Sequence, residues 1–540
     1  MANLDTVPHE ILERIAFISA TDTLLGPPSG LMTLLAANRR IHSRLSFASN
    51  QYLYARIFSA KFDVGPSSGR FIDHSSPTIL AQELIHRFRA LNRIRARTDH
   101  GARPSSAGDG DSVRELLFHA YLMMLENGGK NEQQLRDYAK IGGWVKDYLF
   151  AEHLLARSRL NPHMEHWPPH NEHTSLAMWL FWFLLRPDDY ATDDDSTWNI
   201  LSVLKIYALG AHKYPLTDPS WVDFLPESPP HPTHFIYYPE AHQLKTPPLA
   251  TPAILSFLTL VNLKANNMDF ASHLDMPMKA ESNEWEYELG RCLSLSRPEF
   301  HDRLTKSFRP GSVEGTWEGI FTYTEFTAYA ALLQGAAPPI LQKSVIVRHR
   351  QTWKLREHHF VVGTGLVPSL VDDPSAETHP LAAGDPLRAY LPAGTQINET
   401  HDGLEVREPS SPTEIRYCRS ATGSNSKDAK HNIAHADDRP QVQVQDIIIT
   451  GEGHSAWGQF NLVGRVRPCD GFISLCKEYV DHDRGKWIYR GYLVGNINSN
   501  LAGRWRDTLS PAAVPGYEGC FLMTRRRSSS SVPSQSYSHR

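Results

Sequence analysis

The chain has 540 residues, of which 41% are hydrophobic and 10% aromatic, and its formal net charge is −4. A single hydrophobic core stops growing at about 250–300 residues, so a chain of this length folds as several units. The nearly balanced charge excludes a general electrostatic affinity for nucleic acid or membranes. The longest apolar run, from Ser175 to Leu185, is shorter than the roughly 20 residues that cross a bilayer. Because the first residues also lack the pattern of a secretory signal, we expect a cytoplasmic and/or nuclear protein whose partners include no nucleic acid and no membrane.

The first 62 residues have apolar side chains at helical spacing in three blocks, Val7 to Ile18, Leu31 to Leu45 and Tyr52 to Phe62. Pro8 suits the start of the first helix, because the N–H that proline lacks would have no partner there. A unit of this size can hide only part of its apolar surface by itself. We therefore predict a three-helix unit over residues 1–62 whose apolar stripe is covered either by the next domain or by another protein.

Helical patterns continue through the middle of the chain. Residues 63–112 contain one predicted helix, from Pro77 to about Arg97, and then a polar, glycine-containing segment typical of a flexible linker. Residues 113–310 again show helical spacing, interrupted by proline-rich connectors and without a fixed repeat period. We predict an irregular all-α middle domain there, in which the apolar run from Ser175 to Leu185 is a buried helix.

Near Gly311 the pattern changes to short strands and tight turns. Successive strands joined by hairpin turns, such as the one at Asp470-Gly471, predict an antiparallel β-barrel over residues 311–527 with a polar insertion at about 405–440. The serine-rich segment 528–540 is expected to be disordered. The predicted fold class is α+β multidomain.

The sequence predicts no catalytic, metal-binding or cofactor-binding residues. It contains no Walker loop, nucleophile elbow or dinucleotide-binding fingerprint. Its five cysteines are few, odd in number and scattered, so we expect reduced thiols rather than a zinc site or a disulfide framework. Four histidines between His163 and His173 have helical spacing, but Pro168 and Pro169 would break that helix, which favours a surface loop.

The segment "VPHEILERI", followed by "LMTLLAANRRIHSRLS" and "NQYLYARIF", resembles the F-box. In that family the motif binds the adaptor Skp1, which links it to a cullin-RING ubiquitin ligase. The resemblance covers about residues 3–62. The loop from Gly26 to Gly30 is longer than the family pattern, and Tyr52 and Tyr54 stand where tryptophan is common. The resemblance implies that Skp1 would contact Val7, Pro8, Ile11, Leu12, Ile15, Leu31, Leu34, Leu35 and Leu45.

The predicted strands of the C-terminal region are similar to β-barrel modules that follow the F-box in a subset of F-box proteins, many of them fungal. Within them, "GTWEG" is similar to the first strand of lipocalin-like barrels. Arginines near the strands suit an acidic peptide or a C-terminal carboxylate, because a guanidinium holds a carboxylate by two hydrogen bonds. In a structural role, Arg504 would instead pair with a barrel acid and pack across Trp317. The candidate target-binding residues are Trp317, Tyr323, Arg465, Arg467, Arg490, Arg504 and Trp505.

Together these patterns predict a non-enzymatic substrate-recognition subunit of an SCF-type cullin-RING E3 ubiquitin ligase. Its N-terminal helices would bind Skp1 and its barrel an unidentified protein target. The alternative is a small-ligand-binding or enzymatic β-barrel whose N-terminal helices are only structural. The two hypotheses differ in whether the apolar stripe from Val7 to Ile15 is free, and in whether the barrel interior is filled by side chains.

Overall fold

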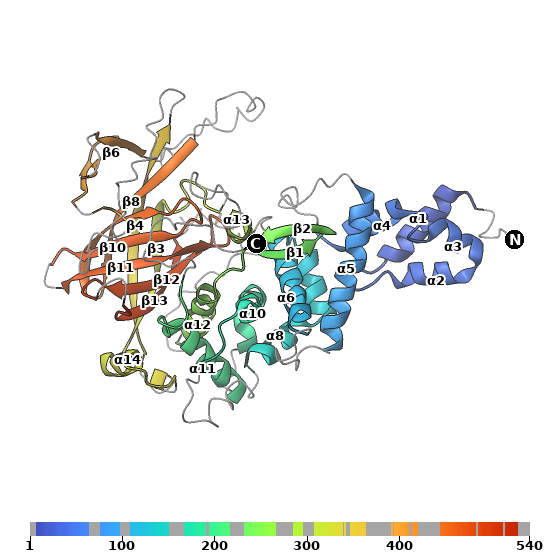
Figure 1. Cartoon of the computed structure of the whole chain (residues 1–540), viewed down its shortest axis with the longest axis horizontal. Helices are drawn as coiled ribbons and strands as arrows, with labels where there is room; N and C mark the ends of the chain where they lie inside the picture. The colour runs from blue at the N-terminus through green and yellow to red at the C-terminus, as the bar shows by residue number, and fades with distance from the viewer. Residues whose placement is uncertain are drawn as a thin grey trace, which may run out of the picture.

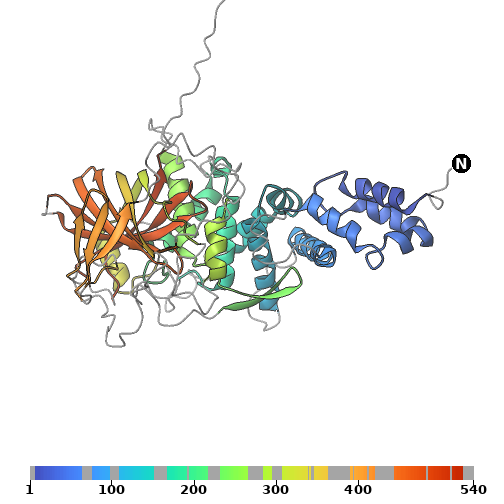
Figure 2. The same ribbon diagram turned by 90° about the horizontal axis from the view of Figure 1, so that it is seen from above.

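The structure, a computed structural model, extends from a small helical unit at the N-terminus through a helical middle region to a β-barrel at the other end, as Figure 1 and Figure 2 show. It describes residues 7–63, 76–97, 109–150, 167–190, 194–216, 232–265, 284–294, 307–338, 340–341, 346–362, 390–392, 394–409, 413–419, 443–481, 484–510 and 514–526. Residues 98–108 of the predicted linker and the predicted tail at 528–540 lie outside this part of the chain.

Residues 7–63 form four helices, α1 (His9–Thr21), α2 (Ser29–Ala37), α3 (Arg39–Leu45) and α4 (Gln51–Lys61), one more than the pattern predicted. The second predicted block splits at Asn38, whose backbone is extended and whose Oδ1 accepts a hydrogen bond from the Ile41 N–H at 2.8 Å. Such an asparagine starts a new helix because it pairs an N–H that the first turn leaves free. Leu12, Leu31 and Leu45, at 1% exposure or less, form the core between the helices.

The middle region is mainly helical, with one unpredicted hairpin. Its elements are α5 (Pro77–Ala96), α6 (Asp109–Leu125), α7 (Lys130–Gln133), η3 (Gln134–Tyr138), α8 (Ile141–Phe150), α10 (Glu172–Leu184), η4 (Pro187–Tyr190), α11 (Asp195–Leu209), β1 (Thr233–Tyr237), β2 (Glu240–Leu244), α12 (Ala250–Ala265) and α13 (Glu286–Ser294). Every residue of α10 from Thr174 to Leu184 is buried, which confirms the prediction of a buried helix. Strands β1 and β2 pair only with each other, so the middle region is not purely helical.

The C-terminal region is a closed antiparallel barrel of eight strands, as predicted. The strands follow the order β3-β13-β12-β11-β10-β9-β8-β4, and pairing of β3 with β4 closes the ring. Their bounds are β3 (Gly315–Thr324), β4 (Ile346–Val362), β8 (Gln443–Ser455), β9 (Gly458–Val466), β10 (Ile473–Tyr479), β11 (Lys486–Val494), β12 (Asn500–Asp507) and β13 (Glu518–Arg525).

Short elements lie next to the barrel, one after β3 and a group beside the last part of β4. Helix α14 (Phe326–Leu333) follows β3 directly. Strands β5 (Gln396–Glu399), β6 (Gly403–Arg407) and β7 (Ile415–Arg419) form a small side sheet that joins the last part of β4. Strand β7 and most of β6 lie within the segment predicted as a polar insertion, so part of that segment is sheet.

Large side chains fill the barrel interior. Trp317, Trp353 and Phe521 are at most 1% exposed and belong to one apolar cluster inside the ring. The segment before β3 closes one end, the floor, where the Trp317 indole donates to the Val313 carbonyl at 2.8 Å and Glu357 accepts the Gly311 N–H at 2.5 Å. An interior filled in this way is a packed core rather than a ligand cavity.

Candidate partner-binding sites

Helix α1 presents three isoleucines to solvent. Ile11, Ile15 and Ile18 are 49%, 37% and 58% exposed, and their spacing places them on one face of the helix. We call these three residues the α1 stripe. Leu12, which points to the other side, is fully buried. Neighbouring apolar side chains at this exposure are a feature of protein interaction sites, so the α1 stripe is a candidate docking surface.

The nine residues predicted to contact Skp1 divide into three groups. Pro8, Ile11 and Ile15 are exposed, Val7, Leu34 and Leu35 are half-buried, and Leu12, Leu31 and Leu45 are buried. The buried three hold the helices together, so a partner cannot reach them while the unit is folded. Ile18 was not predicted, although its position one turn after Ile15 gave the signal.

The long loop between α1 and α2 binds the middle region. The Gly26 N–H donates to Gln134 Oε1 at 2.9 Å, and Gln134 Nε2 donates to the Leu24 carbonyl at 2.6 Å. Lys61 Nζ holds the same loop by donating to the Thr23 carbonyl at 2.8 Å. Gln134 begins the π-helical turn η3, a backbone irregularity that often serves a specific contact. The loop therefore anchors the N-terminal unit to the middle region, and the α1 stripe stays exposed with this anchor in place.

Arg504 joins the barrel to the middle region. Its guanidinium on β12 donates to the carbonyls of Ala208 at 3.0 Å and Tyr207 at 3.1 Å, and also to that of Tyr214. The Tyr207 and Ala208 carbonyls lie in the last turn of α11, where a helix has no partners of its own for its last acceptors, and the Tyr214 carbonyl lies in the segment that follows the helix. The hydrogen bonds of Arg504 therefore go to backbone carbonyls of the middle region, while its charge also interacts with Glu518, a barrel acid on β13. Burial lowers the pKa of its guanidinium.

The other predicted arginines also have partners inside the molecule, on the outer face of the barrel. Arg465 donates to Asp446 at 2.7 Å, Arg467 to Asp470 at 2.8 Å, and Arg490 to Ser474 Oγ at 3.0 Å. Arg467 is completely buried. The strand register places Arg465, Arg490 and Arg504 in one row across β9 to β12, with Ser474 between the first two. Each guanidinium of this row is engaged by a partner within the molecule.

The three predicted aromatic residues belong to the barrel wall and core. Trp317 is at the floor, and the side chain that packs across it is Arg525 from the last strand, with its Cζ 4.9 Å from the ring centroid. Arg504 does not fill that place. Trp505 is 4% exposed and donates its indole N–H to a backbone carbonyl of β3 at 2.9 Å. Tyr323 is half-buried at the end of the barrel opposite the floor.

That opposite end carries exposed apolar side chains. Phe326, Val480, Leu509 and Val514 are 71%, 54%, 89% and 47% exposed. They follow β3, β10 and β12, whose ends all lie on this side of the barrel because neighbouring strands are antiparallel. We call these four residues the rim. Apolar side chains gathered around one end of a closed barrel form a second candidate interaction surface.

Sequence reasoning missed Lys477, which points into the barrel. It is 1% exposed, its Nζ lies 3.9 Å from the centroid of the Phe460 ring, and it donates to Gln351 Oε1 at 3.2 Å. Burial lowers its pKa to about 7. The signal was the alternation along β10, in which Leu475, Lys477 and Tyr479 share one face.

A metal site and a membrane-spanning helix are two features that the described part of the chain lacks. Within it, no group of three or more His, Cys, Asp or Glu side chains is placed to hold a metal ion, and no helix has the length and apolar character needed to cross a membrane. All five cysteines are free thiols, four of them buried and Cys418 exposed. Comparisons with protein-family models, with curated proteins and with solved structures found no match, so the function is inferred from the sequence and the structure alone.

Proposed function

We propose that this protein is a non-catalytic substrate receptor of an SCF-type cullin-RING E3 ubiquitin ligase. Its N-terminal helices bind Skp1, and its C-terminal barrel binds a protein target. The protein then positions its target and carries out no catalytic step itself. It holds a target lysine near the loaded ubiquitin carrier, where proximity replaces a bimolecular encounter.

The exposed α1 stripe is the observation that carries this proposal. Isoleucines at positions i, i+4 and i+7 of a helix are the anchors used when a helix docks into an apolar groove. Fully burying such a side chain contributes about 1.5–3 kcal/mol, and because these three are about half exposed, covering them contributes about 2–4 kcal/mol in total before the costs of association. The half-buried residues Val7, Leu34 and Leu35, which the resemblance also assigns to the adaptor contact, would add to this contribution.

The rim supports a target site at the open end of the barrel. The interior is filled by side chains and the predicted arginines have partners within the molecule, so we assign the target to the rim, the exposed apolar surface at the open end of the barrel. Helix α1, which carries the α1 stripe, and the barrel, which carries the rim, lie at opposite ends of the molecule (Figure 1). A receptor with this layout holds its target away from the adaptor, as delivery to a separate catalytic subunit requires.

Co-purification of Skp1 with the full-length protein tests the adaptor site. The double variant Ile11→Asp, Ile15→Asp is expected to lose Skp1 and keep its fold, because both side chains are exposed. Ile236→Asp is the matched control, since Ile236 is 63% exposed on β1 and lies outside the N-terminal unit, and it should retain Skp1. Folded wild-type protein that recovers no Skp1, or a double variant that recovers as much as wild type, rejects the proposal.

The target site is tested with the double variant Val480→Asp, Leu509→Asp. Proteins that accumulate when the gene is deleted should return to normal levels with wild type but stay high with this variant, while Skp1 binding is unchanged. Full restoration by the rim variant would place the target elsewhere on the chain.

A further inference from the structure

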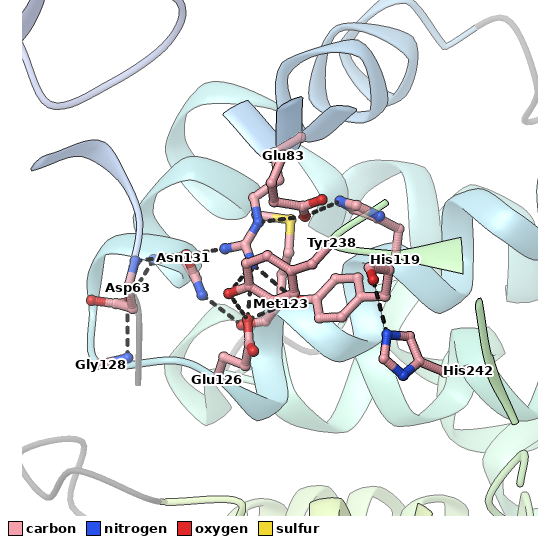
Figure 3. A network of polar contacts seen from close by, with 11 residues as sticks. Asp63, Glu83, His119, Met123, Glu126, Gly128, Asn131, Tyr238 and His242 are labelled. Atoms are coloured by element: carbon pink, nitrogen blue, oxygen red, sulfur yellow. Dashed lines mark hydrogen bonds and ion pairs between the residues drawn. The ribbon is translucent and has the colours of Figure 1, made fainter. Parts of the chain in front are cut away.

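A buried polar network joins the helices of the middle region to the hairpin (Figure 3). Its centre is Arg87 on α5, which donates to Glu83 Oε1 at 3.0 Å, Glu126 Oε2 at 2.8 Å and Asn131 Oδ1 at 3.2 Å. From the hairpin, the hydroxyls of Tyr237 and Tyr238 donate to Glu126 Oε2 at 2.7 and 3.0 Å. One guanidinium therefore holds together α5, α6, α7 and the β1–β2 turn.

The same network touches the N-terminal unit. The rings of Phe58 and Phe62, at the end of α4, have their centroids 4.9 and 5.3 Å from Arg87 Cζ. Asp63, which follows α4, donates its N–H to Asn131 Oδ1 at 3.1 Å and accepts the Asn131 N–H at 2.9 Å. Asn131 and Arg87 thus connect the last turn of α4 to the middle region, and we call this place the joint.

The buried centre of the joint contains two carboxylates, those of Glu83 and Glu126, and the single guanidinium of Arg87, while the partly buried Asp63 carboxylate accepts the backbone N–H groups of Gly128 and Asn131. The side chains of Glu83 and Glu126 are 0% exposed, and both pair with Arg87. Glu83 Oε2 and Glu126 Oε1 each have no hydrogen-bond partner. An unbalanced charge at this depth costs several kcal/mol, so a buried acid keeps a proton instead.

The surroundings assign this proton to Glu83. Burial raises the pKa of Glu83 to about 7, against the opposing effect of Arg87. His119 on α6 lies 3.5 Å from Glu83 Oε1, but burial, with Arg87 and His86 in addition, lowers its pKa to about 3, so it is neutral. His86 also has a lowered pKa because it is partly buried. The two phenols of the hairpin have raised pKa values and are neutral as well.

We propose that a single proton on Glu83 locks the joint between the N-terminal unit and the middle region, and that its loss loosens the hairpin and the end of α4. With the proton present, Arg87 balances Glu126 alone. Without it, two buried carboxylates share one guanidinium, and the elements that bring them together separate more easily. The N-terminal helices are then held less firmly relative to the barrel, whichever partner they bind.

The direction of the pH dependence follows from the raised pKa. Folding makes Glu83 bind its proton more tightly than the unfolded chain does. The stabilisation is therefore complete below the pKa of an unfolded glutamate, about 4.3, and is lost as the pH rises through about 7. Between pH 6 and pH 8.5, the titration of Glu83 should lower the equilibrium constant for closing the joint roughly tenfold.

Hydrogen exchange on the full-length protein at these two pH values, corrected for intrinsic exchange rates, measures the effect. Amides of β1, β2 and the last turn of α4 should lose protection roughly tenfold in wild type. In Glu83→Gln, which cannot ionise and still accepts from Arg87, the loss should disappear. Glu13→Gln is the matched control: it removes a carboxylate that pairs with Arg56 outside the joint, and should behave as wild type.

Glu126→Gln keeps the test decisive if Glu83→Gln does not fold. Removing the second carboxylate takes away one of the causes that raise the pKa of Glu83 and leaves its burial unchanged, so the loss of protection between pH 6 and pH 8.5 should be smaller than in wild type. An unchanged pH dependence in whichever variant folds, or equal protection of wild type at both pH values, overturns the proposal.

Discussion

The N-terminal unit and the barrel place their predicted binding residues in opposite ways. In the N-terminal unit, part of the predicted apolar stripe faces solvent, with Ile11 49% exposed. In the barrel, the predicted arginines and tryptophans are held inside the molecule, and Arg504 is 4% exposed. The size of each unit explains the difference. Four short helices can cover only one side of α1, whereas a large barrel packed against a second region covers most of its own side chains.

The largest expected effect is the difference in stability between substitutions on the buried and on the exposed face of α1. Leu12→Asp would place an unpaired carboxylate at a position with 0% exposure and should lower the free energy of unfolding of the N-terminal unit by about 4 kcal/mol or more. Ile11→Asp, on the exposed face, should change it by no more than about 0.5 kcal/mol. Urea-dependent proteolysis of the unit measures both. Equal stability of the two variants would contradict the division of α1 into a core face and a docking face.

An intermediate effect is expected at the contact between barrel and middle region. Arg504→Met leaves the last carbonyls of α11 without partners and should lower the free energy of unfolding by about 3 kcal/mol. Arg526→Met is the control, because the Arg526 side chain is 66% exposed and its ion pair with Glu318 is worth at most about 0.5 kcal/mol. Urea unfolding followed by tryptophan fluorescence compares them. A loss as small as that of the control would show that α11 does not depend on the barrel.

The smallest effect concerns the barrel interior. The pKa of Lys477 is lowered to about 7, so folding disfavours its charged form. The folded protein is therefore not destabilised by Lys477 above the pKa of an unfolded lysine, about 10.4, where the amine is neutral in both states. This stability is lost as the pH falls through about 7. Lys477→Met should therefore raise the free energy of unfolding by about 1–2 kcal/mol at pH 6, and this advantage should shrink towards pH 10. A constant difference across that range would mean that Lys477 does not titrate inside the barrel.

Features that depend on local pattern could be predicted from the sequence. The run around Trp179 is apolar on all sides, and it forms the buried helix α10. The barrel followed from alternation and turn residues, and its eight strands close as expected. Within α1, helical spacing identified Ile11 and Ile15 but could not separate them from the buried Leu12, because that division depends on where the other helices pack.

Features that depend on distant partners could not be predicted. Arg504 and the Ala208 carbonyl are 296 positions apart, and no local pattern links them. Glu83 and Arg87 are four positions apart on α5, so their ion pair is readable from the sequence. The burial of this ion pair cannot be predicted from the sequence, because it depends on Tyr237, which lies 150 positions beyond Arg87. The hairpin that carries Tyr237 was missed because its strands lie within a proline-rich connector.

The contact of Arg504 with α11 also has a consequence for the order of events during synthesis. The acceptor at Ala208 leaves the ribosome 296 positions before its donor. At about 5–20 residues per second, the end of α11 waits roughly 15–60 s for the strand that completes it. Throughout that interval the carbonyls of Tyr207, Ala208 and Tyr214 lack the guanidinium that later pairs with them, and the middle region lacks the barrel surface that later covers it.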